Sequence, residues 1–269
     1  MPDGAAIVYL YDGSLDGLMC CVFESYTRRE TPIDIVTVDE PQGLLYPTRE
    51  IITVAAHAQR IYASLSQRIC ADAEELVRLG FLTCAPDKAL LIYRFICLGY
   101  RFGGRVMSML TDDTVCALNN AVKSLLNERH LLTGFIRFSE YSGALVATIE
   151  PKNFVLPLLK SHFCSRFAEE HFMIYDAAHG MALTYSPYKA NVIPVESLQL
   201  PEEDEAELQY RRLWKQYYDT IAIEARYNPK CRMTHMPKRY WAYMTEFQEN
   251  PSARMKQHVA NRLSAPPAK

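Results

Sequence analysis

The hydrophobic positions near the start of the chain predict a short strand–helix–strand unit. Residues 5–11 are an apolar run rich in β-forming side chains, which predicts a buried strand. Beyond Asp12-Gly13-Ser14, apolar residues recur at helical spacing, at Leu18, Val22, Phe23 and Tyr26. Residues 33–38 predict a second strand. We therefore expect a βαβ-like unit, whose strands are parallel if the crossover is right-handed.

The turn Asp12-Gly13-Ser14 has two interpretations. The N-terminus of a helix can receive a phosphate or a carboxylate. The same residues also serve as a plain turn in which Ser14 caps the following helix. A single glycine is far short of a phosphate-loop motif, so the turn and cap are favoured.

From residue 48 to about residue 127 the apolar residues recur mostly at intervals of three and four. This spacing predicts helices over residues 50–67, 74–82 and 89–100. A further helix has Asp112 or Thr114 as its cap and continues through Leu126. We expect this region to form a helical bundle.

After Leu131 the pattern changes to short β-like runs. Residues 133–140 and 143–150 predict a hairpin, because the segment between them contains a glycine. Residues 155–167 then predict a helix, with Pro157 in its first turn. Two more strands are predicted over residues 172–175 and 181–185.

These patterns predict an α+β protein. A small N-terminal βαβ-like unit with a helical bundle is followed by a mixed or antiparallel sheet with packed helices. We expect domains at residues 1–127 and 128–250, and a helical extension with a disordered tail at residues 251–269.

The residues after the last predicted strand read as a linker and a helical C-terminal segment. Residues 186–201 are polar and punctuated by proline, which predicts a linker. A helix follows, whose apolar face is expected to pack inward through Trp214, Tyr217 and Ile221. Asn228-Pro229 breaks this helix, and Pro237 starts a short last one.

Charge changes the picture mainly in this C-terminal segment. The chain has 269 residues, 49% of them hydrophobic, and a net charge of −2, so it cannot coat nucleic acid over its whole surface. Residues 210–241 nevertheless hold eight basic residues, two acidic residues, both tryptophans and several tyrosines. Cations interleaved with aromatics hold phosphates and stack bases, so the segment predicts a nucleic-acid contact.

Membrane, redox and metal chemistry receive little support from the sequence. No apolar run is long enough for a membrane span, and the N-terminus lacks a basic region before its apolar run, so a cytoplasmic location is expected. The eight cysteines form no C-x-x-C pair and are expected to be reduced thiols. The histidines are scattered, so we expect neither a metal nor a cofactor.

Several motifs along the chain resemble a family of DNA metabolism or DNA repair proteins. They lie between about Ile7 and Phe247 and include Tyr11-Asp12-Gly13-Ser14, Glu128-Arg129-His130, Thr133-Gly134-Phe135, His162-Phe163, Leu213-Trp214-Lys215, Asn228-Pro229-Lys230 and Arg239-Tyr240-Trp241. The C-terminal module of that family is also found fused to uracil-DNA glycosylase-like domains. Ala225 and Tyr227 depart from the pattern, because charged residues are more usual there.

The resemblance implies a role in DNA metabolism. It also implies a radical-SAM protein partner that resembles spore photoproduct lyase. The chain itself lacks the C-x-x-x-C-x-x-C string that would hold such a partner's cluster. The resemblance names a process and does not fix a reaction.

A first candidate site combines Glu128, Arg129 and His130 with Arg137. A glutamate, a histidine and two arginines near a helix–strand junction could form a phosphate clamp or an acid–base pair. The alternative is a helix C-terminus whose basic residues are stabilised by the helix dipole. Both interpretations stay open.

A second candidate site, the proposed catalytic set, comprises Glu150, His162, Arg166 and Asp176. His162 and Arg166 are four residues apart and share a helix face, while the two carboxylates are expected at strand ends. A glycosylase-like reaction needs a carboxylate or an activated water beside a flipped base. An ion-pair network that holds the sheet to its helix is the favoured alternative.

The third candidate is the basic C-terminal segment. With residues from the first site, the predicted nucleic-acid-binding set is Arg129, His130, Arg137, Arg226, Lys230, Arg232, Lys238, Arg239, Tyr240 and Trp241. The leading function is a DNA repair or DNA metabolism protein that processes a base or presents DNA to a radical-SAM partner. The alternative is a non-catalytic adaptor for such an enzyme.

Overall fold

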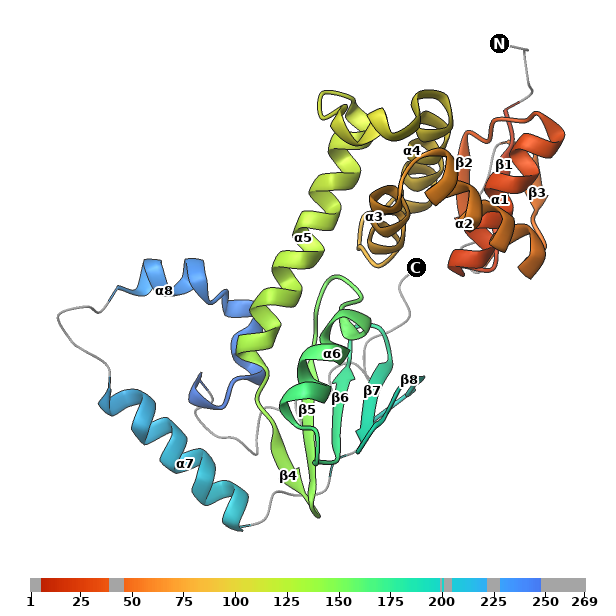
Figure 1. Ribbon diagram of the computed structural model, residues 1–269. Coiled ribbons are helices and arrows are strands. Elements are labelled where there is room, and N and C mark those ends of the chain that lie inside the picture. The colour runs from red at the N-terminus through yellow and green to blue at the C-terminus, as the bar shows by residue number, and fades with distance from the viewer. Residues whose placement is uncertain (1–5, 39–45, 199, 201–204, 222–227, 248–269) are drawn as a thin grey trace. The chain divides into compact units, whose positions relative to one another are not determined.

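The computed structural model in Figure 1 describes residues 6–38, 46–198, 200, 205–221 and 228–247. The chain divides into two compact units, Met1–Leu126 and Asn127–Lys269, called here the N-terminal and C-terminal units. Helices and strands occur in both, in two separate sheets, which confirms the predicted α+β class. Residues 251–269, for which a helical extension and a tail were expected, lie outside the described residues.

The N-terminal unit opens with the predicted βαβ arrangement. Strand β1 (Val8–Tyr11), helix α1 (Leu15–Arg28) and strand β2 (Asp34–Thr37) follow one another, and the two strands pair in parallel with Val8 opposite Asp34. A third strand, β3 (Thr48–Glu50), pairs in parallel with the other edge of β1. The helix predicted over residues 50–67 begins only at Ala55, and Glu50 ends a strand, because pairing with a strand forty residues earlier is invisible to local periodicity.

The turn between β1 and α1 is a helix cap. The Ser14 hydroxyl accepts a hydrogen bond from the Gly17 amide, and Asp12 Oδ1 accepts from the Ser14 amide and hydroxyl. Asp12 Oδ2 accepts from Thr53 Oγ1 at 2.7 Å, although the two residues are 41 positions apart. Burial raises the pKa of Asp12, but these hydrogen bonds outweigh it and hold the pKa below its usual value. A carboxylate in the turn repels phosphate, so the structure favours the cap.

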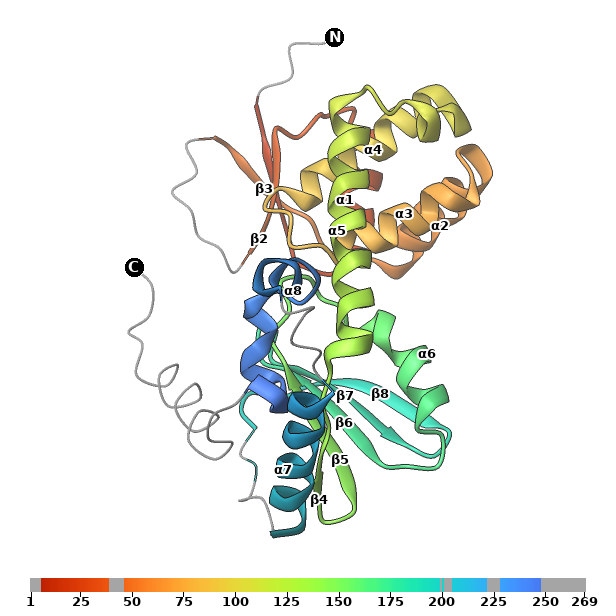
Figure 2. The ribbon, with the colours of Figure 1, turned by 90° about the vertical axis from the view of Figure 1, so that its left-hand side faces the viewer.

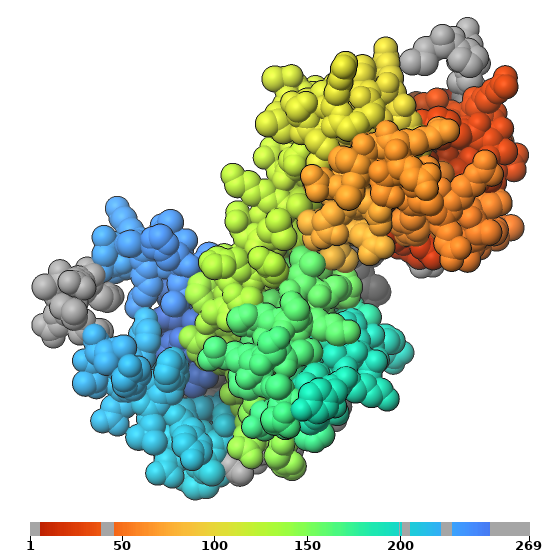
Figure 3. Space-filling model, in the orientation of Figure 1, coloured from red at the N-terminus to blue at the C-terminus, as the bar shows by residue number. Residues whose placement is uncertain are grey.

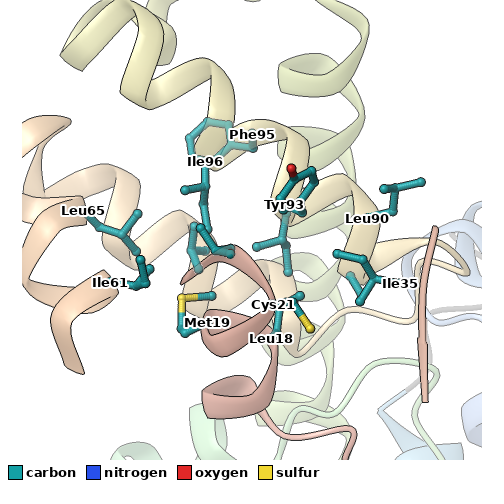
Figure 4. Packing of buried hydrophobic residues seen from close by; sticks show 14 of the residues in the cluster. Leu18, Met19, Cys21, Ile35, Ile61, Leu65, Leu90, Tyr93, Phe95 and Ile96 are labelled. Carbon is teal, nitrogen blue, oxygen red and sulfur yellow. The ribbon is translucent and has the colours of Figure 1, made fainter. Parts of the chain in front are cut away.

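Helices make up the rest of the N-terminal unit. They are α2 (Ala55–Arg68), α3 (Ala71–Phe81), α4 (Lys88–Phe102), the 3-10 helix η1 (Gly103–Ser108) and the start of α5 (Asp113–Phe135). Figure 4 shows their buried side chains meeting those of α1, among them Leu18, Met19, Leu65, Phe95 and Ile96. Cys20 and Cys21 are buried in the same core. None of the eight cysteines, all of which lie within the described residues, forms a disulfide in this structure.

Helix α5 is longer than the sequence indicated. Asp112 Oδ1 accepts from the amides of Thr114 and Val115, so Asp112 is the cap, and the helix continues to Phe135. Residues 133–135 were predicted to begin a strand, and that prediction was wrong. Buried Glu128 and Leu132 hold this end of the helix in the C-terminal unit, so tertiary burial overrides the β-like composition.

The C-terminal unit is built on a five-stranded sheet in the order β4-β5-β6-β7-β8. Its strands are β4 (Ser139–Tyr141), β5 (Ala144–Ile149), β6 (Phe172–Asp176), β7 (Met181–Ser186) and β8 (Lys189–Pro194). The β4–β5 hairpin was predicted, and its turn residues Ser142 and Gly143 both have positive φ. Helix α6 (Leu156–Arg166) connects β5 to its parallel neighbour β6.

Strand β8 is a correction to the predicted linker. Residues 189–194 pair antiparallel with β7, with Lys189 opposite Ser186 and Pro194 opposite Met181. This strand is the sheet edge, where polar residues and a terminal proline are tolerated because one side makes no sheet hydrogen bonds. Its composition therefore resembles that of a linker.

The two faces of this sheet are covered by different parts of the chain. One face carries Ala147, Ile149, Ile174 and Leu183, and α6 packs on it through apolar residues such as Phe163. The C-terminal segment covers the opposite face beside β4 and β5. Figure 2 shows α6 and the C-terminal helix α7 on opposite sides of the sheet.

The C-terminal segment contains α7 (Glu205–Thr220), α8 (Pro229–His235) and the 3-10 helices η3 (Lys238–Tyr243) and η4 (Thr245–Phe247). Asn228 caps α8 by accepting a hydrogen bond from the Cys231 amide. The segment between Asn228 and Pro237, predicted only as a break between two helices, thus contains a short helix. Pro237 does precede a short last helix, as predicted, but it is a 3-10 helix.

Candidate nucleic-acid interface

Three buried glutamates join the C-terminal segment to the rest of its unit. The first is Glu128 on α5, which is 2% exposed. Its carboxylate accepts hydrogen bonds from the amides of Lys152 and Asn153 and from the Asn153 side chain. The Tyr240 hydroxyl donates to Glu128 Oε1 at 3.1 Å, and Arg239 Nη2 lies 2.9 Å from the same oxygen. Glu128 is therefore the hub of a charged hydrogen-bond network.

This network shifts the pKa values of two of its members. Burial raises the pKa of Glu128, but the donors from Lys152 and Asn153 and the charge of Arg239 outweigh it and lower the pKa. Burial and the neighbouring Glu128 carboxylate raise the pKa of Tyr240 to about 12. At neutral pH the carboxylate is ionised and the phenol is protonated, so Tyr240 acts as a donor.

The second glutamate, Glu246 in η4, is 3% exposed. Arg137 donates to both of its carboxylate oxygens, at 2.6 and 3.2 Å, in a bidentate pair. Trp214 Nε1 donates to Glu246 Oε2 at 3.1 Å, and the Arg137 guanidinium lies 5.6 Å from the Trp214 ring centroid. The Arg137 hydrogen bonds lower the pKa of Glu246 against the opposing effect of burial.

The third glutamate, Glu207, fixes α7 to the hairpin. Arg211 Nε donates to Glu207 Oε1 at 2.7 Å, one helical turn away. Arg211 Nη2 also donates to the Ser139 hydroxyl, and the Glu140 amide donates to Glu207 Oε2. Arg211 is only four positions from Glu207, but the Glu140 amide is 67 positions from it and Arg137 is 109 positions from Glu246, so nothing in the sequence indicated that these two glutamates are buried.

These networks place several predicted nucleic-acid-binding residues. Arg137 pairs with Glu246, whereas Arg239 and Tyr240 contact Glu128. Glu128 and Arg137 therefore belong to different networks and do not form one clamp. Arg129 is half-buried on α5, and its Nε makes no hydrogen bond within the described part of the chain. His130 is exposed on the same helix. Arg226 lies outside the described residues.

The proposed catalytic set is divided between the two ends of the strands. Glu150 directly follows β5, and Asp176 is the last residue of β6. Because these two strands are parallel, both carboxylates lie at the C-terminal ends of the strands. Arg166 is the last residue of α6, and the chain then leads to the start of β6. Arg166 therefore lies toward the opposite, N-terminal ends of these strands. His162 and Arg166 are exposed; the His162 ring packs edge-on against Phe163, and the Arg166 guanidinium lies 5.8 Å from the centroid of Phe167.

The two carboxylates already have structural partners. Asp176 is fully buried, and its oxygens accept from the amides of Ala178 and His179 and lie 2.7 Å from His179 Nδ1. Glu150 Oε2 accepts from the Tyr243 hydroxyl at 2.9 Å. Asp176 therefore shapes the β6–β7 turn, and its carboxylate is not open to a substrate.

Helix α7 exposes the apolar face that the sequence predicted to be buried. Tyr210, Leu213, Trp214, Tyr217 and Ile221 are all exposed, with Tyr217 at 55%. The inward side of the helix instead carries the Glu207–Arg211 pair. The inward assignment of Tyr217 and Ile221 was wrong, because the sheet face that α7 covers offers polar partners such as Ser139. Trp214 is partly exposed, but its indole N–H does point inward, to Glu246. Figure 3 shows α7, in light blue, at the surface.

Cations accompany the aromatic side chains of α7. Arg212 is exposed, and among the residues that the structure describes its carboxylate partner is exposed Glu205, at 3.8 Å. Lys215 Nζ donates to the Glu246 carbonyl at 3.4 Å, and its side chain is exposed. An exposed ion pair of this kind contributes little, so Arg212 is available to an external anion.

A second cluster of cations and rings lies in α8 and η3. The Trp241 and Phe247 rings are stacked with centroids 4.5 Å apart. The Arg232 guanidinium lies 5.1 Å from the Trp241 centroid, and Lys238 Nζ lies 5.8 Å from it on an exposed side chain. Lys230 is exposed on α8. Part of the basic C-terminal segment, including Lys230 and Lys238, therefore lies on the surface, as predicted.

The cavity beneath α7 is too small for a base. Its lining includes Arg137, Ser139, Thr148, Arg211 and Tyr243, and its volume is about 30 Å³. That volume suits one or two water molecules, whereas ligand pockets measure roughly 300–1,000 Å³. A flipped base therefore does not fit there.

No group of three histidine, cysteine, aspartate or glutamate side chains in the described ranges is arranged to hold a metal ion. Within the same ranges, no helix is both long and apolar enough to cross a membrane.

Residues 86–246 match the family described as "Domain of unknown function (DUF4130)". The chain belongs to this family. The DUF4130 match covers the whole sheet of the C-terminal unit, all three buried glutamates and α7. No curated protein and no solved structure matches the chain.

The DUF4130 match leaves out the first part of the N-terminal unit. It begins at residue 86, so strands β1 to β3 and helices α1 to α3 lie outside it. The glutamate networks are thus features of the matched region, whereas the βαβ unit is an addition to it.

Proposed function

We propose that this protein acts in DNA metabolism or repair and binds DNA through α7 and the α8–η3 cluster. The observation that carries the proposal is the exposed stripe Tyr210, Trp214 and Tyr217, with Arg212 and Lys215 on the same helix. Exposed aromatic rings beside cations stack unpaired bases and hold the phosphates between them. This arrangement favours single strands, because bases paired in a duplex do not expose their faces.

The proposal shifts the DNA contact from the one expected from the sequence. Arg137, Arg239 and Tyr240 support the surface from below by holding η3 and η4 in place. Lys230, Arg232, Lys238 and Trp241 remain as direct contacts in the second cluster.

Binding of a fluorescent single-stranded oligonucleotide, measured by anisotropy at low salt, tests this proposal. We expect the double variant Trp214→Ala/Tyr217→Ala to bind at least tenfold more weakly, because stacking contributes about 1–3 kcal/mol per base. Tyr188→Ala, which removes an exposed tyrosine from the β7–β8 turn, is the matched control and is expected to bind normally. Failure of the wild type to bind at low salt would sink the proposal.

Salt dependence tests the role of the cations separately. Each phosphate contact on a single strand adds about −0.7 to the slope of log K against log salt concentration. We expect Arg212→Gln/Lys215→Gln to make the slope shallower by about 1 to 1.5, which corresponds to two lost contacts. An unchanged slope would show that these residues do not face the DNA.

Presentation of DNA to a partner enzyme fits the geometry better than base excision by this chain. The proposed catalytic residues are divided between two edges of the sheet, and Asp176 is fully buried. The partner that the family resemblance implies is a radical-SAM protein. If the chain removed uracil from DNA and Glu150→Gln abolished that activity, this choice would be overturned.

The second candidate function is that of a non-catalytic adaptor. Leu213 and Ile221 extend the exposed stripe with aliphatic side chains, which suit a protein surface better than a base. Under this alternative Leu213→Lys weakens a complex with the radical-SAM partner in co-purification, while oligonucleotide binding is undetectable in the wild type.

A further inference from the structure

A groove in the N-terminal unit has the size and chemistry of a ligand site. It lies between α1, α2 and α4 and has a volume of about 500 Å³. Its lining comprises Phe23, Tyr26, Thr27, Arg60, Ile61, Ala63, Ser64, Gln67, Arg68 and Tyr100. Small-molecule sites measure about 300–1,000 Å³ and combine apolar walls with a few polar groups, as this groove does.

Two tyrosines form a fixed aromatic corner in the groove. The Tyr26 and Tyr100 ring centroids are 5.4 Å apart, and the rings are nearly perpendicular at 76°. The Tyr100 hydroxyl is hydrogen-bonded to the Ser64 hydroxyl, which holds its ring in place. Tyr26 nevertheless remains 50% exposed. A planar ring that lies flat on one tyrosine meets the other edge-on, and aromatic groups favour both contacts.

Two arginines supply positive charge along the same groove. Arg60 and Arg68 are exposed on α2, and neither has a carboxylate within ion-pair distance among the described residues. Their separation of eight residues corresponds to about 12 Å along the helix axis. The lining includes no aspartate or glutamate. An anion in the groove therefore meets attraction and no opposing carboxylate.

The two arginines differ in their surroundings. The Arg60 guanidinium lies 5.9 Å from the centroid of Phe23, which in turn stacks on His57 at 3.9 Å. Arg68 lies one helical turn beyond Ser64, whose hydroxyl is bonded to that of Tyr100, and all three residues line the groove. Arg68 is thus the cation beside the aromatic corner, and Arg60 is at the far end of the groove.

We propose that this groove binds a nucleotide, with the base against Tyr26 and Tyr100 and the phosphate on Arg68. If the nucleotide is part of a DNA strand, another phosphate of that strand would reach Arg60. The separation of about 12 Å between Arg60 and Arg68 along α2 corresponds to three to four nucleotides of a stacked strand. The residues that carry this proposal, apart from Tyr100, lie outside the matched family region. The site is separate from α7 and does not depend on the function proposed above.

Calorimetric titration of the full chain with dTMP, thymidine and inorganic phosphate tests the combination of base and phosphate. We expect dTMP to bind at least tenfold more tightly than either part alone, because each part makes only one of the two contacts. Absence of dTMP binding would overturn the proposal. So would inorganic phosphate binding as tightly as dTMP, since the groove would then hold only an anion.

Groove variants locate the bound nucleotide. We expect Tyr26→Leu and Arg68→Gln each to weaken dTMP binding about tenfold, whereas Tyr26→Phe keeps the ring and retains most of the affinity. Arg78→Gln is the matched control, because Arg78 lies on α3 beside Tyr62, outside the groove lining. Thermal unfolding of each variant verifies that it is folded. Unchanged binding in folded Tyr26→Leu and Arg68→Gln would overturn the proposal.

The source of the nucleotide follows from a comparison of dTMP with a 5′-phosphorylated thymidine tetranucleotide. If Arg60→Gln weakens only the tetranucleotide, the groove takes a DNA strand; if it affects neither, the groove takes the free nucleotide. The same titrations with Trp214→Ala/Tyr217→Ala separate this site from α7. Loss of dTMP binding in that variant would assign the nucleotide to α7 and overturn the groove proposal.

Discussion

At the scale of single residues, buried glutamates join segments that are far apart in the sequence. The Glu128 carboxylate accepts hydrogen bonds from Lys152, Asn153 and Tyr240 and pairs with Arg239. Because this carboxylate is buried, its oxygens need such partners in place of water. A buried ion pair adds little net stability compared with apolar packing, but the loss of one partner is costly. In the sequence, Arg137 and Arg239 stand out only as positive charges. In the fold, they are the partners of buried glutamates that join distant segments.

Replacement of Glu128 by glutamine tests this role. We expect Glu128→Gln to lower the free energy of unfolding by about 2–4 kcal/mol, because an amide cannot accept from all of the donors or balance Arg239. Glu140→Gln, an exposed glutamate on β4, is the control and is expected to change stability by less than about 0.5 kcal/mol. Chemical denaturation measures both.

The pH dependence of stability follows from the same carboxylates. The folded-state pKa values of Glu128 and Glu246 lie below their usual value, so their contribution is present above the unfolded-state pKa. It is lost as the pH falls through the lower folded-state values. We expect the melting temperature to drop from pH 7 to pH 3, and to drop less in Glu128→Gln/Glu246→Gln. An equal drop in the double variant would contradict this assignment.

At the scale of elements, α7 shows an inverted arrangement of its polar and apolar residues. The helix packs on its unit through Glu207 and Arg211 and presents Tyr210 and Tyr217 outward, while Trp214, 40% exposed, donates its indole N–H to buried Glu246. A helical stripe reports that one face differs from the other, but it does not say which face meets the protein. The partner surface decides, and here that surface includes the Ser139 hydroxyl and the Glu140 amide.

A double-mutant cycle on α7 tests whether the polar pair anchors the helix. We expect Arg211→Met alone to cost about 2–4 kcal/mol, because it leaves Glu207 buried without its cation. Glu207→Leu/Arg211→Met is expected to recover most of this loss, since no buried charge remains. If the loss in the double variant, measured by thermal unfolding, equals the sum of the losses in Glu207→Leu and Arg211→Met, the pair is not coupled.

At the scale of the whole molecule, the chain has two units with separate cores. The N-terminal core includes Leu18, Leu65 and Phe95, and the C-terminal core includes Leu159 and Ile174. Each unit has its own sheet, and the division falls within α5. Each is large enough to unfold as a cooperative domain.

Hydrogen exchange on the full chain tests whether the units unfold separately. We expect Leu18→Ala to destabilise the N-terminal unit by about 2–5 kcal/mol, because it leaves a cavity at a fully buried position. Amides of β1, α1 and α4 should exchange faster, while those of β5 to β7 keep their protection. The converse is expected for Ile174→Ala. Equal loss of protection in both units would mean that they unfold together.

The sequence by itself determined most of the local structure. Hydrophobic alternation and spacing located β1, α1, β2 and the β4–β5 hairpin, since these depend on near neighbours and turn residues. It also indicated the concentration of charge in the C-terminal segment. It missed β3 and β8, because an edge strand is defined by its pairing partner more than by its own composition.

The candidate site depended much more on tertiary structure. Only the folded chain pairs Arg137 with Glu246 and Arg239 with Glu128, which gives two arginines that were expected to contact DNA a carboxylate partner within the protein. Only the fold turns the aromatic stripe of α7 outward. Sequence periodicity encodes which residues share a face, because this follows from local backbone geometry. Whether that face is buried depends on contacts between residues far apart in the chain.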